Sequence, residues 1–279
     1  MIDLHAHTTA SDGQHRPEEL LRKAKEAGVC TLAVTDHDTV AGLVEAEAAA
    51  RALGVELVPG IELSAFVHGR ETHILGHFVD RDEPVLNGFS TLLRAEREKR
   101  MRTMVQKLVG LGVACEFDEV VKVSGGKNLG RPHLARVLVE RGHVKDVKEA
   151  FDRFIGGGRP AFVERYKLRS DEAIALIRRA GGAATVAHAA VNKLTDAEIA
   201  LLKEQGASGL EVDHPDHPAE VRERLRLLAR ELDLVPTAGS DFHGELIVPG
   251  RKLGATRMDR SDLVRLRDRA PSTEALANA

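Results

Sequence analysis

The sequence has few cysteines and few large aromatic residues, and it has no long apolar segment. It contains no tryptophan, one tyrosine and only two cysteines, Cys30 and Cys115, which lie far apart. Two isolated cysteines support neither a disulfide framework nor a thiolate zinc site. No apolar run approaches the ~20 residues of a membrane span, and the first residues lack the basic and apolar segments of a signal peptide. These absences predict a cytoplasmic protein with reduced cysteines and no membrane partner.

Neither sign of charge is in large excess, because 40 basic residues are offset by 43 acidic ones. A net charge of −3 does not attract long nucleic acids, so no binding to long duplexes is predicted and any phosphate site must be local. Histidine, by contrast, is abundant, with 13 residues. So many imidazoles among so few other rings are typical of a metalloprotein.

Short apolar runs alternate with amphipathic segments, which is the pattern of repeated β-α units. The predicted strands are Ile2–His5, Thr31–Thr35, Glu56–Val58, His73–Phe78, Ala184–Ala187, Gly209–Val212 and Leu234–Thr237. The predicted helices are Pro17–Ala27, Val40–Ala52, Asp171–Ala180, Asp196–Gln205 and Ala219–Leu232. This alternation favours a closed or nearly closed α/β barrel, with function at the strand ends.

One long stretch breaks the alternation. Residues 83–165 are helical by pattern and carry two glycine clusters, so we expect a helical insertion between two barrel strands. The predicted domains are therefore a barrel, formed by 1–82 and 166–279, and the insertion. A basic run within it, including Arg94, shares its helix with Met101 and Met104, and we interpret the run as a solvated face.

Histidines and carboxylates recur where the predicted strands end. The first strand ends in His5-Ala6-His7, and residues two apart in an extended chain point to the same side. A single such pair is weak evidence, since capping groups and buried core histidines are common. Nine residues of ligand type beside converging strands are better explained by two or three divalent ions. The nine are His5, His7, Asp12, His37, Glu62, His73, His188, Asp241 and His243.

Several motifs, in order from the start of the chain to about residue 243, resemble those of the PHP (polymerase and histidinol phosphatase) family of phosphoesterases. They are DLHAHTTASDG, LAVTDHDTVAGL, GIELSA, THILGHFVD, GRPHLARVLVERG, GLEVDHPDHP and AGSDFHG. The resemblance implies a distorted (β/α)7 PHP barrel with an inserted helical cap domain. One departure is Ala189, which follows His188 where many relatives have proline.

The resemblance also implies how the ligands are shared. His5, His7, Glu62 and Asp241 would surround one ion, and Glu62 would bridge to a second ion held by His73 and His188. Asp12, His37 and His243 would hold the third ion and act on the phosphoryl group and the leaving oxygen, which makes them the expected catalytic residues. His214 and His217 are not expected to be ligands, because loop histidines beside prolines are commonly structural.

The expected activity is hydrolysis of phosphate esters. Divalent ions close together can deprotonate a bridging water and neutralise phosphoryl oxygens, so the attack would come from a metal-bound hydroxide. Mixed histidine and carboxylate ligands accept Mn, Fe or Zn, and also Mg. Within the family, the motifs resemble in particular the small bacterial branch that includes nucleoside 3′,5′-bisphosphate phosphatases and RNA 5′-end exonucleases. This resemblance implies a small nucleotide, such as a nucleoside 3′,5′-bisphosphate, or the 5′ end of a short RNA as the substrate. Histidinol-phosphate phosphatase and a non-catalytic metal-binding or polymerase-accessory module remain as alternatives.

A second phosphate site is predicted in the insertion. Pro132 is placed as the first residue of a helix, where free backbone N–H groups favour an anion, and Arg131 could grip a phosphate with two hydrogen bonds. A plain glycine loop before a surface helix is the alternative. Because relatives carry a similar Arg-x-His, Arg131 and His133 are the expected substrate contacts, and Lys127 in the same loop is a weaker candidate.

Overall fold

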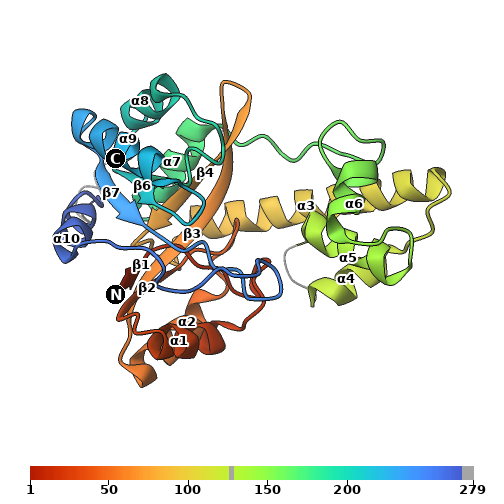
Figure 1. The fold of residues 1–279 in the computed structure, drawn as a ribbon, viewed down its shortest axis with the longest axis horizontal. Coiled ribbons are helices and arrows are strands. Elements are labelled where there is room, and N and C mark those ends of the chain that lie inside the picture. The colour runs from red at the N-terminus through yellow and green to blue at the C-terminus, as the bar shows by residue number, and fades with distance from the viewer. Residues whose placement is uncertain (126–128, 272–279) are drawn as a thin grey trace. The chain divides into compact units, whose positions relative to one another are not determined.

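Seven strands form a nearly closed barrel in the computed structural model, which describes residues 1–125 and 129–271 (Figure 1). Their order in the sheet follows their order in the chain. Backbone hydrogen bonds from Leu4 N to Ala238 O (3.0 Å) and from Asp241 N to His5 O (2.8 Å) join the first strand to the last. The predicted barrel is thus confirmed. The strands are β1 (Ile2–Asp3), β2 (Thr31–Val34), β3 (Glu56–Val67), β4 (Arg70–His77), β5 (Ala183–Val186), β6 (Gly209–Asp213) and β7 (Val235–Ala238).

An antiparallel hairpin interrupts the otherwise parallel barrel. β1, β2 and β3 are parallel, as are β5, β6 and β7, whereas β4 runs antiparallel to both its neighbours. The hairpin turns at His68 and Gly69, which have positive φ angles of 48° and 79°. Because β4 runs the other way, residues near its start lie beside the carboxyl ends of the parallel strands.

Strand β3 is longer than the predicted Glu56–Val58. The predicted strand ends before Pro59 and Gly60, which commonly form turns, but both residues lie inside the observed strand. A Cβ on Gly60 would lie 2.8 Å from Gly76 O and 3.0 Å from Val34 O, so two neighbouring strands pass too close for a side chain. The glycine therefore permits close strand packing here, and Glu62 projects from within a strand.

Helices cover the barrel and each buries an apolar side. In the first of them Pro17 occupies the first turn, and Leu20 and Leu21 are fully buried. An unpredicted last helix packs Leu263 and Leu266 against the barrel core. No helix in the described part of the chain is long and apolar enough to cross a membrane. These helices are α1 (Pro17–Glu26), α2 (Leu43–Leu53), α7 (Ser170–Arg179), α8 (Asp196–Glu204), α9 (Ala219–Glu231) and α10 (Arg260–Asp268).

The chain divides into two compact units, Met1–Phe89 with Lys167–Ala279, and Ser90–Tyr166. The first unit extends past the predicted limit at 82 and includes the first turn of α3, where Leu86 is fully buried. Whether residues 83–165 form a cap domain stays a prediction. The described elements of the insertion are α3 (Pro84–Gly110), α4 (Phe117–Ser124), α5 (Arg131–Glu140), α6 (Val147–Ala150) and the π-helix η1 (Phe151–Ile155).

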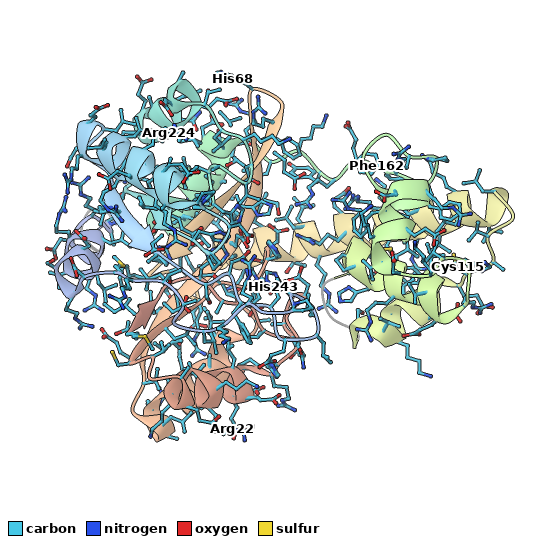
Figure 2. All side chains as sticks on the ribbon, viewed as in Figure 1. Arg22, His68, Cys115, Phe162, Arg224 and His243 are labelled. Carbon is cyan, nitrogen blue, oxygen red and sulfur yellow. The ribbon has the colours of Figure 1, made fainter. Side chains whose placement is uncertain are left out.

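The second unit has its own apolar core. Met101 and Met104 of α3 are buried in it, as expected for the apolar side of that helix. Helix α5 begins at Arg131, so Pro132 is its second residue and not its first. Both cysteines are free: Cys115 is buried in this core and Cys30 is exposed in the first unit (Figure 2 labels Cys115).

His77 is a structural histidine inside the barrel. It is fully buried, its Nε2 donates to Leu4 O at 2.9 Å and its Nδ1 accepts from the Thr185 hydroxyl at 3.2 Å. Burial lowers the pKa of His77 to about 4. The neutral ring therefore ties β4 to β1 and β5, and the folded state resists its protonation.

We expect this ring to make folding acid-sensitive. In the unfolded state His77 binds a proton near pH 6.5, whereas in the folded state it does so only near pH 4. The free energy of unfolding therefore falls as the pH drops through this window. Between pH 7.5 and 5 the loss due to His77 is about 2 kcal/mol. Urea unfolding of chelator-treated protein should show this extra loss in the wild type and not in His77→Gln. Parallel curves for the two proteins would contradict it.

Candidate metal centre

All nine residues predicted as metal ligands meet at the carboxyl ends of the parallel strands; we call them the ligand cluster. His243 marks its place in Figure 2. Within the described residues, four groups of donor atoms lie within 4.8 Å of one another. They are His7, Asp12, His37 and His243; His5, His7 and Asp241; His5, Glu62 and His188; and His37, Glu62 and His73.

Glu62 is the centre of the ligand cluster. Its carboxylate is fully buried and five imidazoles surround it. Burial alone would raise the pKa of Glu62, but the imidazoles, with His37 and His73 foremost, hold it well below its usual range. The Oε1 atom lies 2.8 Å from His73 Nδ1 and 3.1 Å from His188 Nε2, and the Oε2 atom lies 3.1 Å from His37 Nδ1, 3.2 Å from His7 Nε2 and 3.3 Å from His5 Nε2.

Asp12 forms the outer side of the cluster. One of its oxygens lies 3.4 Å from His243 Nε2, and the other lies 3.9 Å from His37 Nε2. Burial opposes ionisation, but His37 and His243 lower the pKa of Asp12 well below its usual range. The loop that carries Asp12 is fixed by the buried Asp36, which accepts hydrogen bonds from the hydroxyl groups of Thr8 (2.7 Å) and Ser11 (2.6 Å).

Asp241 follows β7 with a strained backbone, since its φ of 50° is in the left-handed region. The conformation directs Oδ1 to His7 Nε2 (3.3 Å) and His5 Nε2 (3.4 Å). The other oxygen, Oδ2, lies 3.3 Å from Arg251 Nη1 and 3.5 Å from His214 Nε2. The side chain of Arg251 is only 8% exposed, and the sequence analysis does not single this residue out. Arg251 and His214 thus lie beside Oδ2 of Asp241, and its Oδ1 faces the imidazoles of His5 and His7.

Glu211 on β6 is a further residue that we did not predict. Its Oε1 lies 3.0 Å from His5 Nδ1, and its Oε2 accepts the backbone N–H of His188 at 2.8 Å. His188 itself has a φ of 25° and is followed by the buried Ala189. The carboxylate therefore orients two residues of the cluster. A charged residue inside the apolar strand Gly209–Asp213 was the available signal, because a carboxylate is rarely buried without a partner.

The two histidines excluded at the sequence level differ in their surroundings. His214 is buried, contacts Asp241 and packs its ring 5.6 Å from that of His188. His217 instead donates its Nδ1–H to Val212 O at 3.0 Å, which is a structural role. His214 therefore belongs to the surroundings of the cluster, although it is in none of its four groups.

The donor set fits divalent cations. The Nε2 atoms of His5 and His7 lie only 3.1 Å apart, facing carboxylates. Burial opposes protonation, yet the carboxylates of Asp241 and Glu62 raise the pKa of His7 to about 10, so the surroundings of this ring favour positive charge. Among the described residues, buried Glu62 Oε2, His7 Nδ1 and Asp12 Oδ1 find no hydrogen-bond partner. A cavity of about 220 Å³, lined by His73, His188, Asp241 and others, opens onto the cluster.

The predicted phosphate contacts lie in the second unit. Arg131 begins α5, and its guanidinium carbon lies 5.4 Å from the ring centre of Phe151 and 5.6 Å from that of Phe162. His133 is buried, and its Nδ1 accepts the Gly130 N–H at 3.0 Å. Contact of Arg131 and His133 with substrate stays a prediction, and Lys127 lies outside the described residues.

Comparisons with known proteins agree with this chemistry. The model of the PHP domain matches residues 3–157. A 5′-3′ exoribonuclease of Haemophilus influenzae is 38% identical over 245 residues, covering 86% of this chain and 89% of that protein. A 3′,5′-nucleoside bisphosphate phosphatase of Chromobacterium violaceum is 34% identical over 262 residues, covering 91% of each. The crystal structure of a Bifidobacterium adolescentis protein, assigned as a metal-dependent phosphoesterase, covers 98% of this chain and 97% of its own, with a TM-score of 0.88 and 30% identity.

Proposed function

The chain belongs to the PHP domain family, and from this premise we propose that it hydrolyses phosphate esters of small nucleotides, such as nucleoside 3′,5′-bisphosphates, or of the 5′ end of short RNA. The class of reaction is plain: the protein is a hydrolase of phosphoester bonds. The choice of substrate rests on similarity to relatives named for these two activities. The observation that carries the proposal is the ligand cluster centred on the buried Glu62.

The cluster would hold two or three divalent ions, with Mn, Fe or Zn as the best match to its mixed nitrogen and oxygen donors and Mg as a further option. We assign His5, His7, Glu62 and Asp241 to one ion, and Glu62 with His73 and His188 to a second. Asp12, His37 and His243 would hold a third. When bound, such ions supply an activated water and positive charge for the phosphoryl oxygens.

The residues of the chain contribute electron-pair donors and orientation. Burial lowers the pKa of His37 to about 3, and Asp12 is held ionised, so both offer lone pairs and not protons. Glu211 and Arg251 keep His5 and Asp241 in place. We propose that Asp12, His37 and His243 act on the reacting phosphate and its leaving oxygen through the cation that they would hold.

A turnover screen tests the proposed substrate class. Purified, metal-analysed protein should release phosphate or mononucleotides faster from nucleoside 3′,5′-bisphosphates or 5′-phosphorylated short RNA than from histidinol phosphate. A preference for histidinol phosphate would replace the proposal by the histidinol-phosphate phosphatase alternative. Failure to hydrolyse any nucleotide or RNA in the metal-loaded protein would reject it.

We expect Arg131→Ala to lower kcat/KM by about one to two orders of magnitude, because a charge-assisted hydrogen bond to phosphate is worth ~1.5–3 kcal/mol. A larger loss for a bisphosphate than for a monophosphate would mean that Arg131 grips a second phosphate, and equal losses would place it on the reacting one. Arg136→Ala removes the same charge from an exposed position of α5 and should have little effect. No loss in a folded, metal-loaded Arg131 variant would contradict the assignment.

A further inference from the structure

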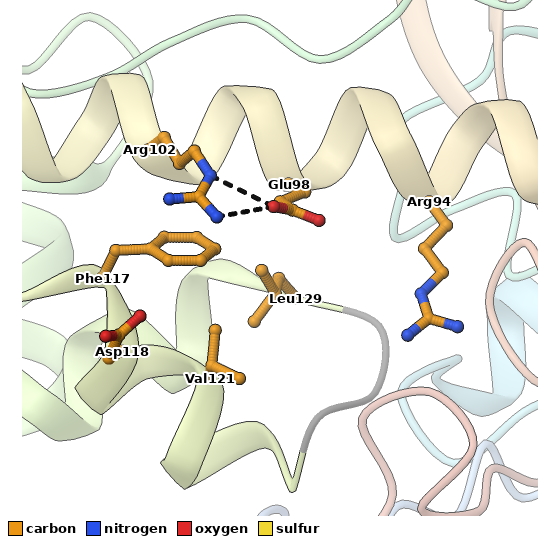
Figure 3. Close-up of a pocket in the computed structure, with 7 residues that line it drawn as sticks. All are labelled: Arg94, Glu98, Arg102, Phe117, Asp118, Val121 and Leu129. Atoms are coloured by element: carbon orange, nitrogen blue, oxygen red, sulfur yellow. Dashed lines mark hydrogen bonds and ion pairs between the residues drawn. The ribbon is translucent and has the colours of Figure 1, made fainter.

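A second pocket lies within the insertion unit, between α3 and α4 (Figure 3). Its volume is about 300 Å³, which is at the lower end for small-molecule sites. Arg94, which the sequence placed on a solvated face, and Arg102 line it from α3. None of its lining residues belongs to the ligand cluster, so its chemistry has to be considered separately.

The most specific feature of the pocket is a stack of a guanidinium on a phenyl ring. The guanidinium carbon of Arg102 lies 3.7 Å from the ring centre of Phe117. Its Nε and Nη2 both donate to Glu98 Oε1, at 3.1 and 2.7 Å, and Figure 3 shows both bonds. Arg102 nevertheless remains 54% exposed. The contacts fix the plane of the guanidinium, and its exposure leaves it accessible to another flat group.

The other residues that line the pocket favour a neutral, flat ligand over an anion. Val121 and Leu129 give the pocket an apolar wall. The carboxylates of Glu98 and Asp118 also line it, and carboxylates repel a phosphate but accept hydrogen bonds from amino groups. A flat, partly apolar group that carries N–H donors therefore fits better than an anion does.

We propose that this pocket binds a nucleobase with an exocyclic amino group, stacked on Arg102 and Phe117, as part of a single-stranded RNA substrate. Guanidinium planes and aromatic rings are the usual stacking surfaces for unpaired bases. Leu129 is two residues before Arg131, so the segment that leads into α5 borders both this pocket and the predicted phosphate contact. The inference rests on the proposed function, and of the proposed substrates it favours RNA over small nucleotides.

A fluorescent base gives a direct test. A short 5′-phosphorylated RNA containing 2-aminopurine is titrated with metal-loaded protein that carries Asp12→Ala to prevent cleavage, and the lack of tryptophan keeps the background low. Stacking quenches the probe, and we expect Phe117→Leu and Arg102→Gln each to reduce that quenching and to raise the KM for the RNA about tenfold. The control Lys99→Gln removes an exposed charge of α3 that is not part of the pocket lining and should behave as the wild type.

A substrate without a base separates this proposal from the proposed function. With p-nitrophenyl phosphate both pocket variants should keep the wild-type kcat/KM. If RNA and nucleotides are hydrolysed but the variants lose no quenching and no more activity on RNA than on p-nitrophenyl phosphate, the pocket does not bind a base. If the wild type hydrolyses p-nitrophenyl phosphate but no nucleotide or RNA, the proposed function itself fails.

Discussion

Replacing Glu62 with glutamine is expected to lower kcat by about three orders of magnitude and to leave less than one tightly held ion per chain. The wild type should hold two or three. The reason is the position of this carboxylate, which five imidazoles surround and which we propose as the bridge between two cations. Glutamine keeps the volume but removes the charge, so the barrel core should still pack.

Elemental analysis and steady-state turnover check this prediction together. The control Glu45→Gln removes a carboxylate that pairs with Arg16 at the surface, and it should change neither quantity. Circular dichroism shows whether the Glu62 variant is folded. Wild-type metal content and turnover in a folded Glu62→Gln protein would reject the bridging role.

Asp12→Ala should abolish most turnover, by about two to three orders of magnitude, while the fold and the other ion sites remain. Asp12 is partly accessible at the outer side of the cluster, and its loop is held by Asp36 through Thr8 and Ser11, so the fold does not depend on its side chain. Loss of one ion is the expected cause. His37→Ala should act in the same way.

Metal titration during turnover distinguishes this outcome from its alternative. The exposed Asp82→Ala is the matched control, since its side chain is far more accessible and lies outside the cluster. If Asp12→Ala or His37→Ala kept near-normal turnover at saturating metal, a two-ion mechanism without these residues would be the better account.

The strands were predictable where a continuous apolar run identifies a buried strand. Seven such runs correspond to β1 through β7, because burial on both sides demands apolar residues throughout. The prediction was wrong about the length of β3, since Pro59 and Gly60 usually end strands, whereas here Gly60 lets the neighbouring strands at Gly76 and Val34 approach closely. Helix α10 was missed because its many arginines obscure an apolar side of only two leucines.

The site was predictable for residues that bear ligand groups at strand ends. Their meeting point follows from the barrel, which brings the carboxyl ends of its parallel strands together. The supporting residues were not predictable in the same way. Glu211 and His5 are 206 residues apart, so no local spacing in the sequence indicates their contact. Arg251 and Asp241 are ten residues apart, but the loop between them has no regular spacing that would predict theirs.

The join between β1 and β7 has a consequence for how the protein matures. His5 and His7 follow β1 and Asp241 and His243 follow β7, so four of the nine residues of the ligand cluster lie at that join. A chain emerging from the ribosome lacks Asp241 and His243 until its last strand has been made. Cation loading is then a late event that follows closure of the barrel, as expected for contacts so distant in sequence. Chelation should accordingly speed hydrogen exchange first at the Leu4 and Asp241 amides, where the barrel closes.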